Sequence, residues 1–171
     1  MDVLTRHARP GDGEAMSRVL DESGRAAWTH FLPAEGLAGL DTPAGRLERD
    51  IAAEEVVAFV AERDGEVVAF AVVRPTRDGG GDPGRTGELD TLYALPSAWG
   101  HGVGRMVMSQ ALDALRKLAF EEATLWTAEE NHRARHVYEA AGWRLDGARR
   151  RKTFIGVQFT ELRYRISLDG R

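Results

Sequence analysis

The chain has 171 residues, 43% of them hydrophobic and 29% charged, so residues 1–171 are expected to form one domain with a full core. Its formal net charge of −4 at pH 7 disfavours a general nucleic-acid-binding role, because neutralising phosphates requires a basic surface. It contains no cysteine, which excludes disulfides, thiolate metal ligands and a cysteine nucleophile.

The N-terminal residues carry no recognisable targeting segment. Met1 to Leu4 lacks a basic stretch followed by an apolar core. No apolar run in the chain approaches the ~18 residues that a membrane-spanning helix needs. We therefore expect a cytoplasmic protein that does not use a membrane as a partner.

The chain opens with a predicted strand and a predicted helix. Residues 3–9 alternate weakly between apolar and polar side chains, which is typical of a strand. Asp12 follows a Pro-Gly turn signal and is expected to cap a helix that ends near Gly24. Residues 25–40 show no regular period and are expected to be irregular.

A second helix and a β-hairpin are expected next. Residues 43–51 begin with a proline, which the first turn of a helix accepts. Residues 56–61 and 67–73 have the pattern of two strands, joined by the hairpin signal Arg63-Asp64-Gly65-Glu66. Residues 75–87 are rich in Gly, Asp and Arg, and they predict a flexible connection without core residues.

The most informative stretch runs from Glu88 to Leu118. It has the pattern of a strand, a short turn at Pro96, a loop with alternating glycines, and a long amphipathic helix. The apolar residues of this helix recur at three- and four-residue spacing. Those expected to form its buried face are Val103, Met106, Val107, Ala111, Ala114, Leu115 and Leu118.

The C-terminal third is expected to add a strand, a short helix and two further strands. Residues 123–127 have the pattern of a strand, and Asn131–Ala141 has that of a helix stopped by a glycine. Residues 143–152 and 158–168 predict two terminal strands, joined around Phe154-Ile155-Gly156. No internal repeat and no second domain boundary is evident.

Three glycines, Gly100, Gly102 and Gly104, alternate where the long helix is expected to begin. Backbone N–H groups in the first turn of a helix have no intrahelical partner, and the helix dipole adds partial positive charge there. Glycines let a phosphate approach that backbone without meeting a β-carbon. The stretch therefore predicts a cradle for a diphosphate.

Two common phosphate-binding motifs do not fit this stretch. In a dinucleotide fingerprint, G-x-G-x-x-G/A, the sixth position is a small residue, but here it is Arg105 or Val107. An NTPase loop requires Gly-Lys-Ser/Thr, whereas Arg105-Met106 follows the last glycine. Instead, Leu92–Pro96 and Trp99–Gly104 resemble the signature of the GNAT superfamily of acyl-CoA-dependent N-acetyltransferases. That signature is Q/R-x-x-G-x-G/A after a strand that ends in an apolar-x-Val-x-Pro-like segment.

A second segment extends the resemblance. Asn131 to Trp143 is similar to the family block N-x-x-A-x-x-x-Y-x-x-x-G-F, with Trp in place of Phe. The expected order β-α-α-β-β-β-α-β-α-β-β is also that of the family. The resemblance implies a mixed α/β fold, with a mostly antiparallel central sheet of six to seven strands flanked by about four helices.

The resemblance also implies transfer of acetyl from acetyl-CoA, as cosubstrate, to a primary amine by direct attack in a ternary complex. Backbone amides at the end of the central strand would receive the thioester carbonyl and the pantetheine arm. The residues expected to hold the cosubstrate are Leu92, Tyr93, Ala94, Trp99, Gly100, His101, Gly102, Val103, Gly104, Arg105 and Asn131. Trp99 departs from the usual Q/R, so that side chain's contact to the diphosphate is missing or comes from His101 or Arg105.

Three residues are candidates for proton transfer. The resemblance makes Tyr138 the acid that protonates the departing thiolate; the alternative is a core tyrosine bonded to nearby backbone. Glu88 and Asp90 lie two apart on the central strand, hence on one face with Leu92. Either carboxylate, or both, could accept the amine proton or bind the ammonium, unless they form a solvated strand face.

No metal is expected. His132 and His136 are four apart on a predicted helix, a spacing that can indicate a metal site. However, Arg133 stands where a zinc protease has Glu, and no third ligand is evident. Surface histidines are therefore the preferred interpretation.

The acceptor amine is left open by the sequence. Trp28, His30 and Phe31 could line its pocket, or simply pack in the core. The run Arg149–Lys152 is expected to be a solvated strand end, with binding of an acidic acceptor or a CoA phosphate as the alternative. A small-molecule amine is favoured over a protein N-terminus or lysine. A non-catalytic CoA-binding sensor, a Rossmann-type nucleotide-binding protein and a homodimer stay as alternatives.

Overall fold

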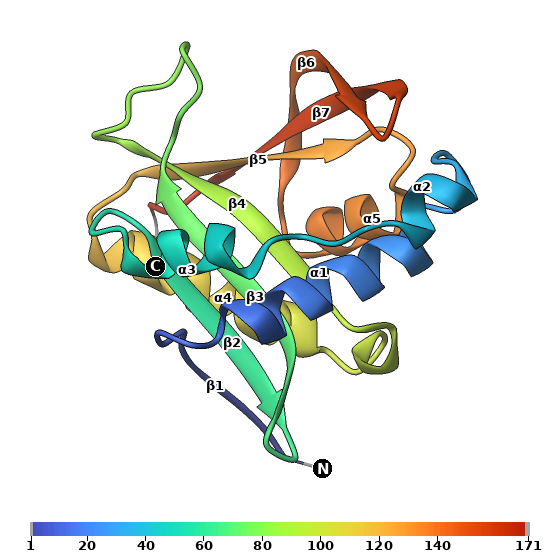
Figure 1. The fold of residues 1–171 in the computed structure, drawn as a ribbon. Helices are drawn as coiled ribbons and strands as arrows, with labels where there is room; N and C mark the ends of the chain where they lie inside the picture. The colour runs from blue at the N-terminus through green and yellow to red at the C-terminus, as the bar shows by residue number, and fades with distance from the viewer. Residues whose placement is uncertain (1, 170–171) are drawn as a thin grey trace.

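A seven-stranded sheet forms the centre of the computed structural model, which describes residues 2–169 (Figure 1). Its strands are β1 (Val3–His7), β2 (Val57–Arg63), β3 (Glu66–Pro75), β4 (Thr86–Ala94), β5 (Glu122–Ala128), β6 (Arg144–Phe154) and β7 (Val157–Ser167). Its helices are α1 (Gly13–Ala27), α2 (Ala34–Ala38), α3 (Ala44–Ala52), α4 (Val103–Lys117) and α5 (His132–Ala140), with a 3₁₀ turn η1 (Pro96–Ala98).

The strands lie in the order β1-β2-β3-β4-β5-β7-β6. Every neighbouring pair is antiparallel except β4 and β5, which are parallel and are joined by the crossover helix α4. The predicted mixed α/β fold with a mostly antiparallel sheet is therefore confirmed. The short helix α2 is additional, within a segment that was predicted to be irregular.

Both predicted hairpins are present, and each turns at two residues with positive φ. Asp64 and Gly65 have φ of 54° and 80° between β2 and β3. Ile155 and Gly156 have φ of 42° and 75° between β6 and β7. Turns of this kind match the right-handed twist of the flanking strands, which is why Asp-Gly is a strong hairpin signal.

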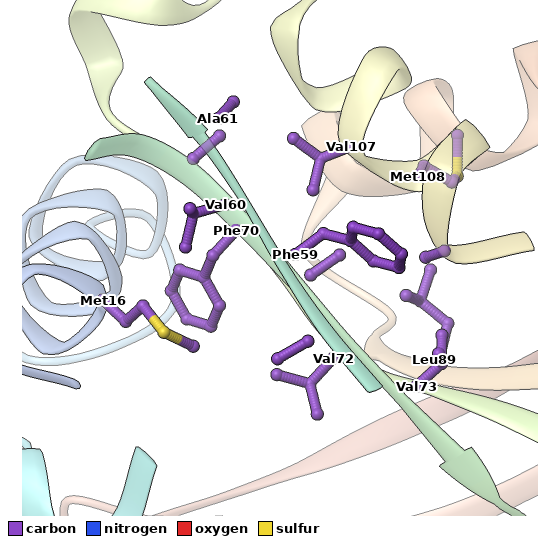
Figure 2. Packing of buried hydrophobic residues seen from close by; sticks show 14 of the residues in the cluster. Met16, Phe59, Val60, Ala61, Phe70, Val72, Val73, Leu89, Val107 and Met108 are labelled. Carbon is purple, nitrogen blue, oxygen red and sulfur yellow. The ribbon is translucent and has the colours of Figure 1, made fainter. Parts of the chain in front are cut away.

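The hydrophobic core lies on both faces of β3. Figure 2 shows Met16 of α1 beside Phe70 on one face, and Val107 of α4 beside Phe59 on the other. Because helices cover both faces, the apolar run from Val67 to Val73 is buried along its whole length. No helix within residues 2–169 is long and apolar enough to cross a membrane.

The buried face of α4 differs from the predicted one. Met106 and Leu118 are 40% and 56% exposed, whereas Met108 and Leu112 are buried. Leu118 lies just past the helix end. The residues that pack on the sheet recur at four-residue steps from Val103. Met106 therefore lies at the edge of this buried face.

Helix α1 extends three residues beyond the predicted end at Gly24. A β-carbon at Gly24 would lie 2.5 Å from the Trp28 ring, so this glycine permits a close contact rather than stopping the helix. Asp12 precedes the helix but makes no side-chain cap. Its carboxylate instead accepts hydrogen bonds from Arg6 at 2.7 Å and from the Arg9 backbone N–H at 2.7 Å.

The connection from β3 to β4 is more anchored than expected. Thr76 and Thr86 are buried, so the prediction that residues 75–87 contain no core residues is wrong. Asp78 accepts hydrogen bonds from Trp126 of β5 at 2.9 Å and from Arg163 of β7 at 3.2 Å. These contacts hold the connection across the sheet, beside the site described next.

Candidate active site

The parallel strands β4 and β5 separate in the middle of the sheet. Only Thr86–Glu88 pairs with Glu122–Thr124. Farther along, β4 bonds to β3 alone, and β5 bonds to β7 alone. Among the described residues, one edge of Leu92–Ala94 therefore has no strand partner. Its backbone polar groups are available to a ligand, except the Ala94 carbonyl oxygen, which accepts a hydrogen bond from the Trp99 indole N–H.

Strand β4 also contains a one-residue bulge at Asp90. Its pairing with β3 shifts between Leu89 and Thr91, which leaves Asp90 as an extra residue. An extra residue reverses the alternation of side chains along a strand. Leu92 and Glu88 consequently lie on opposite faces of the sheet, and the prediction that they share a face is wrong.

The glycine loop has the geometry expected of a phosphate cradle. Gly100 and Gly102 both have φ of 77°, and Gly102 immediately precedes α4. A β-carbon added at Gly100, Gly102 or Gly104 would meet no protein atom within 4 Å. The first hydrogen bond of α4 runs from the Met106 N–H to the Gly102 carbonyl, at 3.0 Å.

The backbone N–H groups of Val103, Gly104 and Arg105 precede that first bond and have no intrahelical partner. Together with the open space above the glycines and the dipole of a 15-residue helix, they suit a diphosphate. The residues present therefore fit the phosphate portion of coenzyme A.

A cavity of about 870 Å³ joins the glycine loop to the gap between β4 and β5. It brings together most of the residues predicted from the sequence. These are Asp90, Leu92, Tyr93, Ala94, Trp99, Gly100, Gly102, Val103, Gly104, Arg105, Asn131 and Tyr138. Asn131 accepts a hydrogen bond from the Ala134 N–H at 3.4 Å and so caps α5, as expected of a helix-starting residue.

Two of the predicted residues do not line the cavity. Glu88 is buried behind it, with 7% of its surface exposed. His101 is exposed, and its Nδ1 lies 2.8 Å from the Trp99 carbonyl oxygen in its own loop. The loop's own backbone thus occupies one ring nitrogen of His101.

Tyr138 is buried on α5, and its ring packs edge-on against Trp143 with centroids 6.2 Å apart. It also lines the cavity, and its hydroxyl has no hydrogen-bonding partner among residues 2–169. Burial raises the pKa of this phenol above its ordinary value, and the nearby Tyr93 raises that pKa further. The hydroxyl is therefore protonated at neutral pH and available as a donor.

The two candidate carboxylates belong to an ion-pair network. The guanidinium of Arg77 donates to Glu88 at 3.3 Å and also to Asp90. Arg74 bridges Asp90 at 2.9 Å and Asp50 of α3 at 2.8 Å. The side chains of Glu88 and Asp90 are only 9% and 13% exposed, so the alternative of a solvated strand face is wrong.

The far end of the cavity is lined by aromatic residues. Trp28 and Phe31, predicted from the sequence, contact the tip of the β6–β7 hairpin. Their ring centroids lie 5.9 Å from Phe154 and 5.6 Å from Phe159. His30 is not part of the wall; its Nε2 contacts the Glu130 carbonyl oxygen.

Charged residues complete this end, and two of them, Glu161 and Arg46, were not identified from the sequence. Glu161 of β7 is 7% exposed and pairs with Arg150 at 2.6 Å and Lys152 at 3.6 Å. Arg46 of α3 and Lys152 also line the cavity. The run from Arg149 to Lys152 is exposed, as predicted; of its four residues Lys152 lines the cavity, while Arg150 packs over the Trp126 ring. No local pattern marks Arg46 or Glu161 as part of the wall, because α3 and β7 come together only in the fold.

No group of three or more His, Asp or Glu side chains within residues 2–169 is arranged to hold a metal ion. The exposed His132 stacks on His30, with ring centroids 5.8 Å apart.

These features define a domain suited to holding a phosphate-bearing ligand at the start of α4 and a second ligand near the β6–β7 hairpin. Residues 23–143 match the pattern of the Acetyltransferase (GNAT) family. The chain is 34% identical to mycothiol acetyltransferase of Sanguibacter keddieii over 142 residues, which are 82% of this chain and 43% of that protein. This chain belongs to the GNAT acetyltransferase family, as its sequence motifs predicted.

Solved structures share the fold. PaiA N-acetyltransferase from Thermoplasma acidophilum, in complex with coenzyme A, has a TM-score of 0.80 at 16% identity, covering 98% of this chain and 99% of that one. YncA from Salmonella typhimurium, with its cofactor acetyl-CoA, has a TM-score of 0.78 at 18% identity, covering 100% and 96%. The chain spans about half the length, or less, of several curated relatives that it matches.

Proposed function

We propose that this chain transfers an acetyl group from acetyl-CoA to the primary amine of a small molecule, by direct attack in a ternary complex. The observation that carries the proposal is one continuous cavity. It connects the unpaired N–H groups at the start of α4 with the aromatic end beside the β6–β7 hairpin, past the free edge of β4. Holding two reactants side by side in this way supplies ~7–11 kcal/mol of an acyl-transfer barrier.

Backbone groups would hold the cosubstrate. The N–H groups of Val103, Gly104 and Arg105 face the space above the glycines and would bind its diphosphate. The free edge of Leu92–Ala94 would receive the pantetheine arm and the carbonyl oxygen, with Asn131 nearby at the start of α5. Bound acetyl-CoA supplies an activated acyl group with a thiolate leaving group; one aligned donor to a developing oxyanion is worth ~2.7–4 kcal/mol.

Proton transfer would fall to two side chains in the cavity wall. Asp90 would accept a proton from the incoming ammonium and so free the amine to attack, because Asp90 lines the cavity while Glu88 lies behind it. Glu88 would affect Asp90 indirectly, because the guanidinium of Arg77 donates to both carboxylates. Tyr138 donates its phenolic proton to the departing sulfur.

A small-molecule acceptor is supported by the closure of the aromatic end. The hairpin tip packs Phe154 and Phe159 onto Trp28 and Phe31, which covers this part of the cavity. Four aromatic rings favour an amine with an apolar body, since burying such a body is stabilising. Several relatives are named mycothiol acetyltransferase, so the amine precursor of mycothiol belongs among the compounds to test.

A thermal-shift series tests the proposed function. At 100 times its Kd, acetyl-CoA is expected to add ~2.7 kcal/mol of stability. At ~2–4 °C per kcal/mol for a chain of this size, the melting temperature should rise by several degrees. NAD should give no rise, and a panel of apolar primary amines should then consume acetyl-CoA in a free-thiol assay.

Each alternative has its own outcome in that series. Stabilisation by NAD instead of acetyl-CoA would indicate a nucleotide-binding protein. Stabilisation by acetyl-CoA without turnover of any amine would indicate a CoA-binding sensor. Turnover of peptides in preference to every small amine would indicate a protein acetyltransferase.

Substituting the two carboxylates is expected to separate their roles. Asp90→Asn should lower kcat/KM for the amine by about 10–100-fold, the effect of losing a charged hydrogen bond of ~1.5–3 kcal/mol. Glu88→Gln should have a smaller effect, because its side chain does not reach the cavity wall. Steady-state kinetics on both variants show which carboxylate contributes more to kcat/KM. A larger loss of kcat/KM in Glu88→Gln than in Asp90→Asn would reverse the assignment.

A further inference from the structure

Trp99 occupies the position where the GNAT motif has Gln or Arg, and its only donor is already engaged. The indole N–H donates to the Ala94 carbonyl oxygen at 2.8 Å. An indole has one donor and no acceptor, so this hydrogen bond leaves nothing to offer a phosphate. Trp99 therefore fixes the end of β4 to the loop, and the side-chain contact usual at this position must come from another residue.

Arg133, near the start of α5, lies over the ring of this tryptophan. Its guanidinium carbon is 4.1 Å from the Trp99 ring centroid. Both residues line the cavity together with Gly100 and Gly102. Arg133 is exposed and makes no side-chain hydrogen bond or ion pair to any residue from 2 to 169, which leaves the edge of its guanidinium free.

The stacked arrangement suits a phosphate ligand. Stacking uses the face of the guanidinium and leaves its N–H donors pointing outward in one plane, a geometry that matches phosphate oxygens in pairs. The tryptophan also restricts the rotamers of Arg133 before a ligand arrives, so less entropy is lost on binding. Two other replacements were considered from the sequence. The Nδ1 of His101 already contacts the Trp99 carbonyl oxygen. Arg105, in the first turn of α4, also lines the cavity, but it is Arg133 that an aromatic ring holds in place.

We propose that Arg133, held over the ring of Trp99, binds the diphosphate of coenzyme A and supplies the side-chain contact that the motif position itself lacks. Arg133 is then a cosubstrate-binding residue, and Trp99 is the residue that positions it. The assignment rests on the proposed binding of the diphosphate by the glycine loop.

Calorimetric titration with coenzyme A tests the assignment without requiring an acceptor. Arg133→Ala should raise the Kd about tenfold or more, as expected for losing charged hydrogen bonds. Arg116→Ala is the matched control, because Arg116 is on α4, does not line the cavity and pairs with Asp113. It removes the same charge and should leave the Kd unchanged.

Titration with dephospho-coenzyme A, which lacks the 3′-phosphate but keeps the diphosphate, locates the contact. The loss in Arg133→Ala should be equally large with this ligand. A loss seen only with coenzyme A would place Arg133 on the 3′-phosphate and overturn the assignment. An unchanged Kd in Arg133→Ala would also overturn it, whereas failure of the unsubstituted chain to bind either ligand would reject the proposed function itself.

A second-site variant provides the positive test. Trp99→Arg restores the motif residue, so in the Arg133→Ala background it should recover much of the lost affinity. If the double variant binds no better than Arg133→Ala alone, the two positions do not serve the same phosphate group. Circular dichroism on each variant checks that the loop substitution leaves the fold intact.

Discussion

Replacing Tyr138 with Phe is expected to lower kcat by ~10²–10⁴-fold, the usual contribution of a positioned general acid. The affinity for acetyl-CoA should stay unchanged, because the substitution removes only a hydroxyl that has no partner among the described residues. The ring would keep its packing against Trp143 and Tyr164, both with centroids 6.2 Å away, so stability should change little. Single-turnover rates and calorimetry measure the two quantities separately.

The pH profile offers a further check on the same residue. Burial raises the pKa of Tyr138 above its ordinary value of 10.0, and the neighbouring Tyr93 raises that pKa further. The acid is therefore in its protonated form throughout the neutral and mildly alkaline range. The rate should not fall on the alkaline side of neutrality through loss of this proton.

Tyr164→Phe is a matched control for Tyr138→Phe. The Tyr164 hydroxyl is fully engaged: it donates to Glu139 at 2.6 Å and accepts from Arg135 at 2.9 Å. Removing it should lower the free energy of unfolding by ~1–3 kcal/mol, since both partners lose a hydrogen bond, while kcat is preserved. Equal kcat values for the two variants would rule out Tyr138 as the acid.

Local patterns explain why much of the fold could be predicted. The Asp64-Gly65 turn needs two positive φ values, and Asp-Gly is among the residue pairs that adopt them most readily. Gly100 and Gly102 likewise adopt φ of 77° at the start of α4, where the backbone must turn sharply and stay uncovered. Such features depend on consecutive residues, so the sequence displays them directly.

Features that depend on distant partners could not be predicted. The bulge at Asp90 exists only in the pairing of β4 with β3, and it reversed the expected face of Leu92. The acceptor end joins Trp28 and Phe31 to Phe154 and Phe159, which follow them by more than a hundred positions in the chain. The spacing of residues within one segment does not predict such a long-range contact.

The same distinction separates the two halves of the candidate site. The end at the start of α4 is formed largely by residues of the consecutive run Trp99–Arg105, and a motif could locate it. The aromatic end draws on α1, α3, β5, β6 and β7, so the pairing of Lys152 with Glu161 emerged only from the structure. Acceptor specificity should accordingly change with substitutions in the β6–β7 hairpin, while the cradle stays the same.

Substituting Gly102 with Ala should abolish tight binding of coenzyme A, raising its Kd by about 100-fold or more. Two effects combine: the methyl group enters the open space where the diphosphate is expected, and alanine resists φ of 77°. Displacing the ligand from two charged hydrogen bonds, each worth ~1.5–3 kcal/mol, accounts for the magnitude. The measurement is calorimetry with coenzyme A, alongside urea unfolding.

Gly65→Ala separates these two effects. Gly65 has φ of 80°, and a β-carbon there also meets nothing within 4 Å, but it lies in the β2–β3 hairpin and outside the cavity. Both variants should lose a similar ~1–2 kcal/mol of stability, the cost of placing a β-carbon in the left-handed region. Because backbone strain is matched, any additional loss of affinity in Gly102→Ala comes from filling the cradle. Equal affinity for coenzyme A in the two variants would mean that the diphosphate binds elsewhere, whatever the fold resembles.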